Sequence, residues 1–157
     1  MNKTLLNVEH LKCNFILENK LFKKSIYLKA IDDISFKINE GITLGIVGES
    51  GCGKSTLCRT ILSLNKKSSG KVIWFDKDLD KLSNKELKDF RKKVQIIFQD
   101  PYGSLNPRMT VGNIICEPLN IFRTDLNKKE KMIRVLEIMD QVGLSNILFN
   151  RFPHELS

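Results

Sequence analysis

One stretch of the sequence combines glycines, a lysine and hydroxyl side chains at a spacing that suits phosphate binding. Residues 48–55 read Gly-Glu-Ser-Gly-Cys-Gly-Lys-Ser, which satisfies the pattern G-x-x-x-x-G-K-[ST], and Thr56 follows. Glycines let backbone N–H groups approach phosphate oxygens, a lysine at position 54 reaches the β- and γ-phosphates, and the Ser55 hydroxyl is a ligand for Mg²⁺. The segment therefore predicts a cradle for a nucleoside triphosphate with Mg²⁺.

Other interpretations of this segment are weaker. A chance match at four fixed positions is expected in roughly 1% of chains of this length. A dinucleotide fingerprint requires Gly or Ala where this chain has Thr56, and no acidic partner for a ribose follows the next expected strand. Cys52 invites a redox role because thiols near helix N-termini are activated, but a small side chain that fits the loop is the simpler explanation.

A phosphate-binding loop of this kind lies between a strand and a helix. The apolar, β-branched run Ile42–Val47 predicts a buried strand before the loop. After the loop, Leu57, Ile61 and Leu64 recur at helical spacing and predict a helix. We therefore expect the order strand, glycine loop, helix.

The remaining pattern predicts a β-rich first half and a helical second half. Ser83 with Glu86, and Asn127 with Glu130, are spaced as helix N-terminal capping pairs, and Gly143 is a natural end for the second of these helices. In that helix, one face is expected to carry Met132, Val135, Leu136 and Met139. Further strands are expected over residues 5–15, 31–38, 71–75 and 94–98.

Composition narrows the functional classes. The 157 residues carry 26 Lys+Arg against 18 Asp+Glu, a net charge of +8, and 41% are apolar. This is a globular composition for one domain or part of one, and no apolar run approaches the ~20 residues of a membrane span. The basic residues are scattered among acids, so nucleic acid is not the favoured partner. The spacing of the four cysteines favours neither zinc nor disulfides.

A second segment is more specific than the glycine loop. Residues 96–112 read Ile-Ile-Phe-Gln-Asp-Pro-Tyr-Gly-Ser-Leu-Asn-Pro-Arg-Met-Thr-Val-Gly, and residues 151–157 read Arg-Phe-Pro-His-Glu-Leu-Ser. Together with residues 47–56, they closely resemble the ATP-binding subunit of ABC transporters, and more narrowly its oligopeptide/dipeptide permease branch. The resemblance runs from about Val8 to the last residue. It implies an α/β P-loop NTPase fold of the ABC nucleotide-binding type, truncated, with a β-rich ATP-binding core at 1–98 and a Q-loop plus helical subdomain at 99–157.

The resemblance also implies roles for individual residues. Phe15 falls where the family places an aromatic ring that stacks on adenine, and its alternative is an ordinary core or edge-strand Phe. Gln99 matches the Q-loop glutamine, which would contact Mg²⁺ or the attacking water. Lys54 and Gln99 are thus the candidate catalytic residues, and Ser55 and Gln99 the candidate Mg²⁺ contacts. His154 belongs to the lead-in of the signature motif and is not a candidate base. The expected ATP-binding set is Phe15, Gly48, Glu49, Ser50, Gly51, Cys52, Gly53, Lys54, Ser55 and Thr56.

Partners and location follow from the resemblance. ATP and Mg²⁺ are the implied cofactors. The implied partners are transmembrane permease subunits and a second ATP-binding subunit, in a homodimer or heterodimer, with an extracytoplasmic solute-binding protein acting indirectly and no nucleic acid. The stretch 100–110 would face the membrane partner. The implied location is cytoplasmic, peripheral on the inner face of the cell membrane. Whether the solute is a peptide, nickel or another compound, and which ATPase is the partner, are not encoded in these residues.

The family pattern continues beyond Ser157 with the rest of the signature, a strand ending in Asp-Glu and a switch histidine. Three apolar segments that end in aspartate resemble that strand, at Asp76, Asp100 and Asp140, but none of them fits it. Asp76 lacks a following Glu, Asp100 lies in the Q-loop, and Asp140 falls on an expected helix. We therefore expect nucleotide binding with little hydrolysis by this chain, so its status as an enzyme stays open. The alternatives are a non-catalytic nucleotide-binding remnant of an interrupted gene and a soluble ABC-type ATPase acting on nucleic acid, and a small-molecule kinase fits least well.

Overall fold

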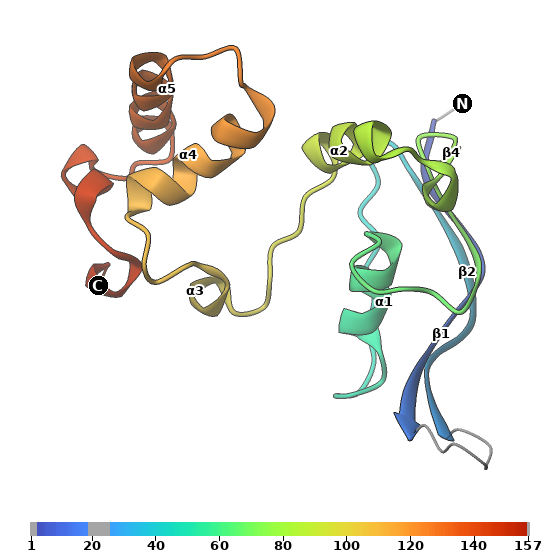
Figure 1. Cartoon of the computed structure of the whole chain (residues 1–157). Helices are drawn as coiled ribbons and strands as arrows, with labels where there is room; N and C mark the ends of the chain where they lie inside the picture. The colour runs from blue at the N-terminus through green and yellow to red at the C-terminus, as the bar shows by residue number, and fades with distance from the viewer. Residues whose placement is uncertain (1–2, 19–25, 157) are drawn as a thin grey trace. The chain divides into compact units, whose positions relative to one another are not determined.

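The computed structural model describes residues 3–18 and 26–156 (Figure 1). The chain divides into two compact units, Met1–Val94 and Gln95–Ser157. Each unit has its own hydrophobic core. We describe the two units separately.

A four-stranded antiparallel sheet organises the first unit. It contains β1 (Thr4–Glu18), β2 (Ile26–Asn39), β3 (Ser69–Trp74) and β4 (Lys77–Asp78) in the order β2-β1-β3-β4. The predicted strands at 5–15 and 31–38 lie within the longer β1 and β2, and the predicted strand at 71–75 overlaps β3, which begins two residues and ends one residue earlier; all three strands are confirmed. The sheet contributes most of the fully buried side chains, namely Leu6, Val8, Leu11, Cys13 and Val72.

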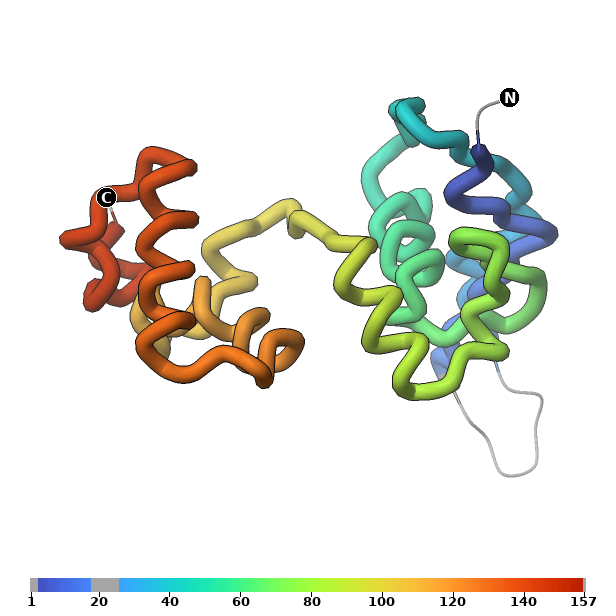
Figure 2. Tube along the Cα trace, turned by 90° about the horizontal axis from the view of Figure 1, so that it is seen from above, coloured from blue at the N-terminus to red at the C-terminus, as the bar shows by residue number. Residues whose placement is uncertain are grey.

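Helices cover one side of this sheet. The helices α1 (Lys54–Ile61) and α2 (Asn84–Lys93) both lie on that side (Figures 1 and 2), and a short 3₁₀ turn, η1 (Leu79–Lys81), precedes α2. Leu57 of α1 and Phe90 of α2 are buried in the same cluster as the sheet residues. The predicted cap of α2 is confirmed, because the Ser83 hydroxyl accepts a hydrogen bond from the Glu86 N–H (3.3 Å) while the Glu86 carboxylate accepts one from the Ser83 N–H (3.1 Å).

Two predicted strands are wrong. Residues 42–47 and 94–98 contain no strand, and the side chains of Val47 and Ile97 are 93% and 91% exposed. A buried parallel strand requires hydrogen-bonded neighbours and covered faces, whatever its β-propensity. Among residues 3–18 and 26–156, the sheet consists of β1 to β4, and neither run joins it as a strand.

The second unit is helical. It contains α3 (Pro101–Ser104), α4 (Val111–Phe122), α5 (Lys128–Gln141) and the 3₁₀ turns η2 (Asn146–Asn150) and η3 (Pro153–Glu155). Its buried core consists of Val111, Val135 and Met139. Within the described residues, no helix is long and apolar enough to span a membrane.

The second capping pair is likewise confirmed. The Asn127 side-chain oxygen accepts from the Glu130 N–H (3.0 Å), the Glu130 carboxylate accepts from the Asn127 N–H (2.7 Å), and Gly143 follows α5 with φ of 71°. The predicted apolar face of α5 is correct for Val135, Leu136 and Met139, which pack in the core. Met132 lies on the same face, three residues before Val135, but it is half-exposed and is not among the residues that pack in this core.

Candidate nucleotide-binding site

The glycine loop leads directly into α1. Gly53 is the N-cap residue in a left-handed conformation (φ 100°, ψ 3°), and Gly51 also has a positive φ of 80°. Left-handed backbone is strained for residues with a Cβ, which explains glycine at these positions. No side chain caps the first N–H groups of α1. The loop therefore presents a helix N-terminus whose donors are free of a side-chain cap, where the helix dipole favours an anion.

Lys54 folds back over this loop. Its ammonium donates to the carbonyl oxygens of Gly48 (2.7 Å) and Glu49 (2.6 Å) and lies 3.6 Å from the Cys52 sulfur. An ammonium has three donors, so these contacts use all of them. The thiol is the weakest acceptor of the three, and that donor is the one most readily given to a phosphate oxygen. Cys52 is exposed in this loop, and its sulfur is the third contact of the Lys54 ammonium.

The loop rests on the second strand of the sheet. A Cβ placed on Gly53 would overlap the carbonyl oxygen of Ala30 in β2. Only glycine allows this approach, so residue 53 is constrained both by its φ and by its neighbour. Ala30 was not among the residues predicted to belong to the site.

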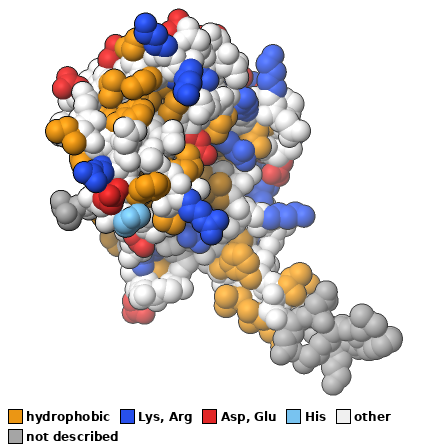
Figure 3. Space-filling view, turned by 60° about the vertical axis from the view of Figure 1, so that its left-hand side comes forward, with side chains coloured by type: hydrophobic (Ala, Val, Ile, Leu, Met, Phe, Trp, Pro, Cys, Tyr) orange, Lys and Arg blue, Asp and Glu red, His pale blue; other side chains and the backbone are white. Residues whose placement is uncertain are grey.

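Phe15 lies near the end of the ribbon formed by β1 and β2. It is paired with Leu28, and the two side chains are 39% and 50% exposed. Cys13, two residues earlier in β1, is buried against the helices, and strand alternation puts Phe15 on that same face. Further large apolar side chains are exposed along this end of the ribbon (Figure 3), namely Ile16, Leu17, Ile26 and Tyr27. The Phe15 ring is therefore accessible on the side of the sheet that carries the loop and α1.

The other predicted site residues divide between the two units. Ser55 lies exposed in the first turn of α1, and Thr56 is half-buried behind it. Gln99 is exposed in the second unit, just before α3, where Asp100 caps the helix by accepting from the Gly103 N–H (2.9 Å). The loop residues 48–56 and Phe15 belong to the first unit, whereas Gln99 belongs to the second. A role for Gln99 at the nucleotide-binding loop stays a prediction.

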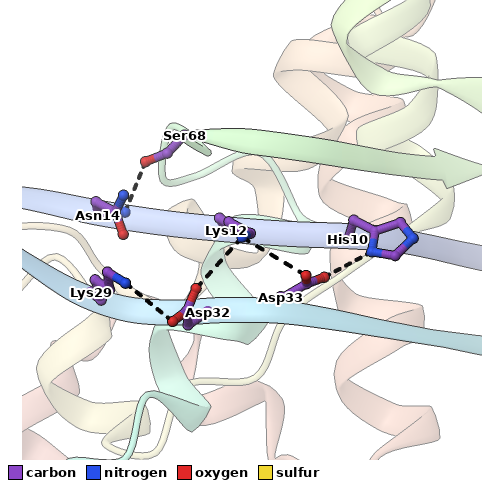
Figure 4. A network of polar contacts seen from close by, with 7 residues as sticks. All are labelled: His10, Lys12, Asn14, Lys29, Asp32, Asp33 and Ser68. Atoms are coloured by element: carbon purple, nitrogen blue, oxygen red, sulfur yellow. Dashed lines mark hydrogen bonds and ion pairs between the residues drawn. The ribbon is translucent and has the colours of Figure 1, made fainter.

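On the other side of the ribbon from α1 lies a polar network (Figure 4). The Lys29 ammonium lies 3.4 Å from the Asp32 carboxylate, and His10 Nδ1 lies 2.8 Å from Asp33. The hydrogen bond with His10 lowers the pKa of the Asp33 carboxyl from its ordinary value. The strand β2 is irregular at this point, where Asp33 has a positive φ of 61°. The pair Asp32-Asp33 between Ile31 and Ile34 is the sequence signal of this irregularity, because it breaks the alternation of a regular strand.

Metal binding at the site would depend on the phosphates. Within residues 3–18 and 26–156, no group of three or more His, Cys, Asp or Glu side chains is placed to hold a metal ion. Mg²⁺ commonly retains waters and binds through few protein ligands together with substrate phosphates. The Ser55 hydroxyl, exposed at the first turn of α1, fits that arrangement.

These features define the class of protein: an α/β P-loop nucleotide-binding domain of the ABC type, with a β-rich core and a helical subdomain. The family model described as ABC transporter matches residues 31–157, and the chain belongs to that family.

Relatives place the chain more narrowly. It is 50% identical over 156 residues to the oligopeptide transport ATP-binding protein OppF of Haemophilus influenzae, covering 98% of this chain and 47% of that protein. It is 47% identical over 158 residues to OppF of Bacillus subtilis, covering 100% of this chain and 50% of that protein. The chain therefore spans about half the length of these relatives.

A solved structure supports the fold. The dimeric, post-hydrolysis state of the ATP-binding cassette MJ0796, bound to ADP and Pi, matches with a TM-score of 0.76 at 25% identity, over 98% of this chain and 63% of that one. The predicted family and fold class are thereby confirmed.

Proposed function

We propose that this chain forms the MgATP-binding part of the energy-coupling subunit of a peptide-type ABC importer. The observation that carries the proposal is the glycine loop, in which Lys54 is held by the carbonyls of Gly48 and Glu49 beside the uncapped N-terminus of α1. The oligopeptide and dipeptide transport proteins among the relatives support the choice of transport class.

The site residues have complementary roles in this proposal. The β- and γ-phosphates lie at the N-terminus of α1, where backbone N–H groups and the helix dipole stabilise their charge. Lys54 transfers a donor from the Cys52 thiol to a phosphate oxygen while the two carbonyls keep its ammonium over the loop. The Ser55 hydroxyl would hold Mg²⁺, which would neutralise phosphate charge when bound. Phe15 stacks on the base.

We propose further that the chain alone hydrolyses little ATP. Hydrolysis needs a group that orients and deprotonates the attacking water. The three carboxylates that imitate the family's missing strand have other positions: Asp76 is in the turn after β3, Asp100 caps α3, and Asp140 is in the last turn of α5. Gln99 is the proposed contact to Mg²⁺ or the water. Residues 1–98 are the proposed ATP-binding core, and residues 99–157 are the proposed Q-loop and helical subdomain.

The working assembly is part of the same proposal. Permease subunits, a second ATP-binding subunit and an indirectly acting solute-binding protein are the proposed partners, with the chain at the inner face of the membrane. The dimeric neighbour structure supports the pairing of two such domains.

Equilibrium binding of MgATP to the chain tests the proposal, with Lys54→Ala as the key variant. Removing a charge-assisted contact should weaken binding about 10- to 100-fold. Lys85→Ala is the control, because Lys85 is an exposed lysine on α2. Equal affinities for these two variants would refute nucleotide binding by the loop. ATP turnover that is lost in Lys54→Ala would instead contradict the expected lack of hydrolysis.

A further inference from the structure

The second strand contains an extra residue next to the glycine loop. Cys13 pairs with Ile31, and the next residue, Asn14, pairs with Lys29, so Ala30 has no partner in β1. An extra residue in one strand is a β-bulge, which bends the strand and changes the face on which the following side chains lie.

This bulge shapes the site in two ways. Without it, strict alternation from the buried Ile31 would put Lys29 on the side of α1 and Leu28 on the opposite side. With it, Leu28 lies opposite Phe15 on the side of α1, where the pair forms an apolar platform. The bulge also presents the Ala30 carbonyl to Gly53, against which the glycine loop rests.

An ion cluster on the opposite side of the sheet spans the bulge (Figure 4). The Asp32 carboxylate lies 3.4 Å from the Lys29 ammonium and 3.8 Å from the Lys12 ammonium. Lys29 and Asp32 flank the bulge in sequence, so their ion pair joins the chain across it. Lys12 belongs to β1 and also lies 3.8 Å from Asp33, so it ties the same segment to the central strand.

We propose that Asp32 is a positioning residue for the nucleotide site: its ion pairs with Lys29 and Lys12 hold the Ala30 bulge, and the bulge holds both the loop at Gly53 and the Phe15–Leu28 platform. The inference rests on the proposed nucleotide-binding function. Asp32 does not contact the nucleotide and acts through the backbone of β2.

The expected effect is modest because the pairs are exposed. The side chains of Lys29 and Asp32 are 67% and 55% exposed, and exposed ion pairs contribute little individually. Loss of the Asp32 charge should therefore raise the Kd for MgATP about two- to fivefold. Because salt screens such pairs, the ratio of the two Kd values should approach one in ~1 M NaCl.

The test compares Asp32→Asn with Asp89→Asn in the full chain, using equilibrium binding of MgATP. Asp89 is a matched control, because its exposed ion pair with Lys92 (2.9 Å) lies on α2. Asp32→Glu retains the carboxylate and should bind within about twofold of the unmodified chain. A second measurement is the hydrogen exchange rate of backbone amides 48–56, which needs no nucleotide.

Weaker binding and faster exchange in Asp32→Asn alone, with thermal midpoints equal in the two variants, support the inference. Equal Kd values and equal exchange in the two Asn variants would overturn it. A lowered thermal midpoint that accounts for the whole change in affinity would also overturn it, since Asp32 would then act on stability only. If the unmodified chain binds no MgATP, the proposed function fails, and amide exchange still decides whether Asp32 positions the loop.

Discussion

Replacing Gly53 with alanine tests the fit of the loop against β2. Gly53 has a φ of +100°, and its Cβ would overlap the Ala30 carbonyl oxygen, well inside the ~3.3 Å at which carbon and oxygen ordinarily meet. Gly51 has a φ of +80°, but no atom lies within 4 Å of the position that a Cβ would take there, so Gly51→Ala introduces strain without the clash. The two variants therefore separate conformational strain from contact with Ala30.

The magnitudes follow from these two differences. Left-handed backbone costs an alanine about 1–2 kcal/mol, which corresponds to a loss of affinity of about 5- to 30-fold for Gly51→Ala if the loop must keep its shape to bind. The clash adds about 1–3 kcal/mol to Gly53→Ala, a further loss of affinity of about 5- to 160-fold. Strain in the loop is destabilising in either variant, so thermal midpoints must be measured beside the affinities.

Calorimetric or fluorescence titration with MgATP is the assay. Gly41→Ala is the control, because Gly41 has a φ of +75°, nothing within 4 Å, and a position outside the loop. It should lower stability and leave the affinity for MgATP unchanged. If Gly53→Ala and Gly51→Ala bind MgATP equally, the contact between the loop and Ala30 has no energetic significance and the reasoning is refuted.

Three further predictions concern the two units. Leu57→Ala should destabilise the first unit by about 2–5 kcal/mol, measured by urea unfolding, because Leu57 is 5% exposed in the core and its loss leaves a cavity. Gly112→Ala should destabilise the helical unit by about 1–3 kcal/mol, since its Cβ would meet the Phe149 ring at 2.6 Å, while leaving MgATP affinity unchanged. Hydrogen bonds from Lys77, then from Ser83, lower the Glu86 pKa from 4.5 to about 2. A lowered pKa stabilises the fold above pH 4.5, and this contribution is lost as the pH falls towards 2, so Glu86→Gln should flatten the pH dependence of the urea midpoint in that window.

Local patterns in the sequence predicted the elements that are stabilised locally. The capping pairs at Ser83 and Asn127 lie at helix starts because each satisfies donors within four residues of chain. The strand at 31–38 was predictable because its partner, β1, is present and its apolar residues lie against the core. The runs at 42–47 and 94–98 have the same propensities, yet their pairing depends on segments distant in sequence, which propensity does not report.

In the candidate site, too, the features fixed by nearby residues could be predicted, and those that depend on distant segments could not. The glycine pattern identified which residues form the loop, because each needs a particular residue type at a fixed spacing. It did not identify Ala30 or Leu28, because their positions depend on how β1 and β2 are registered, and one unpaired residue changes the face of every residue after it. Two successive aspartates were the visible signal of an irregular strand, but they did not indicate that Ala30 was the unpaired residue.

The two ends of the glycine loop are supported unequally. At its C-terminal end, α1 is fixed by Leu57 in the core and Gly53 rests on Ala30. At its N-terminal end, the preceding run is exposed, with Val47 at 93%, and no segment within the described ranges pairs with it. On that side, Gly48 and Glu49 are held by Lys54, which itself belongs to α1. The contact between Gly53 and Ala30 therefore does more to position the loop than it would if a paired strand also held the N-terminal end. For this reason, a change at Asp32, on the far side of the sheet, should be measurable in the binding of MgATP.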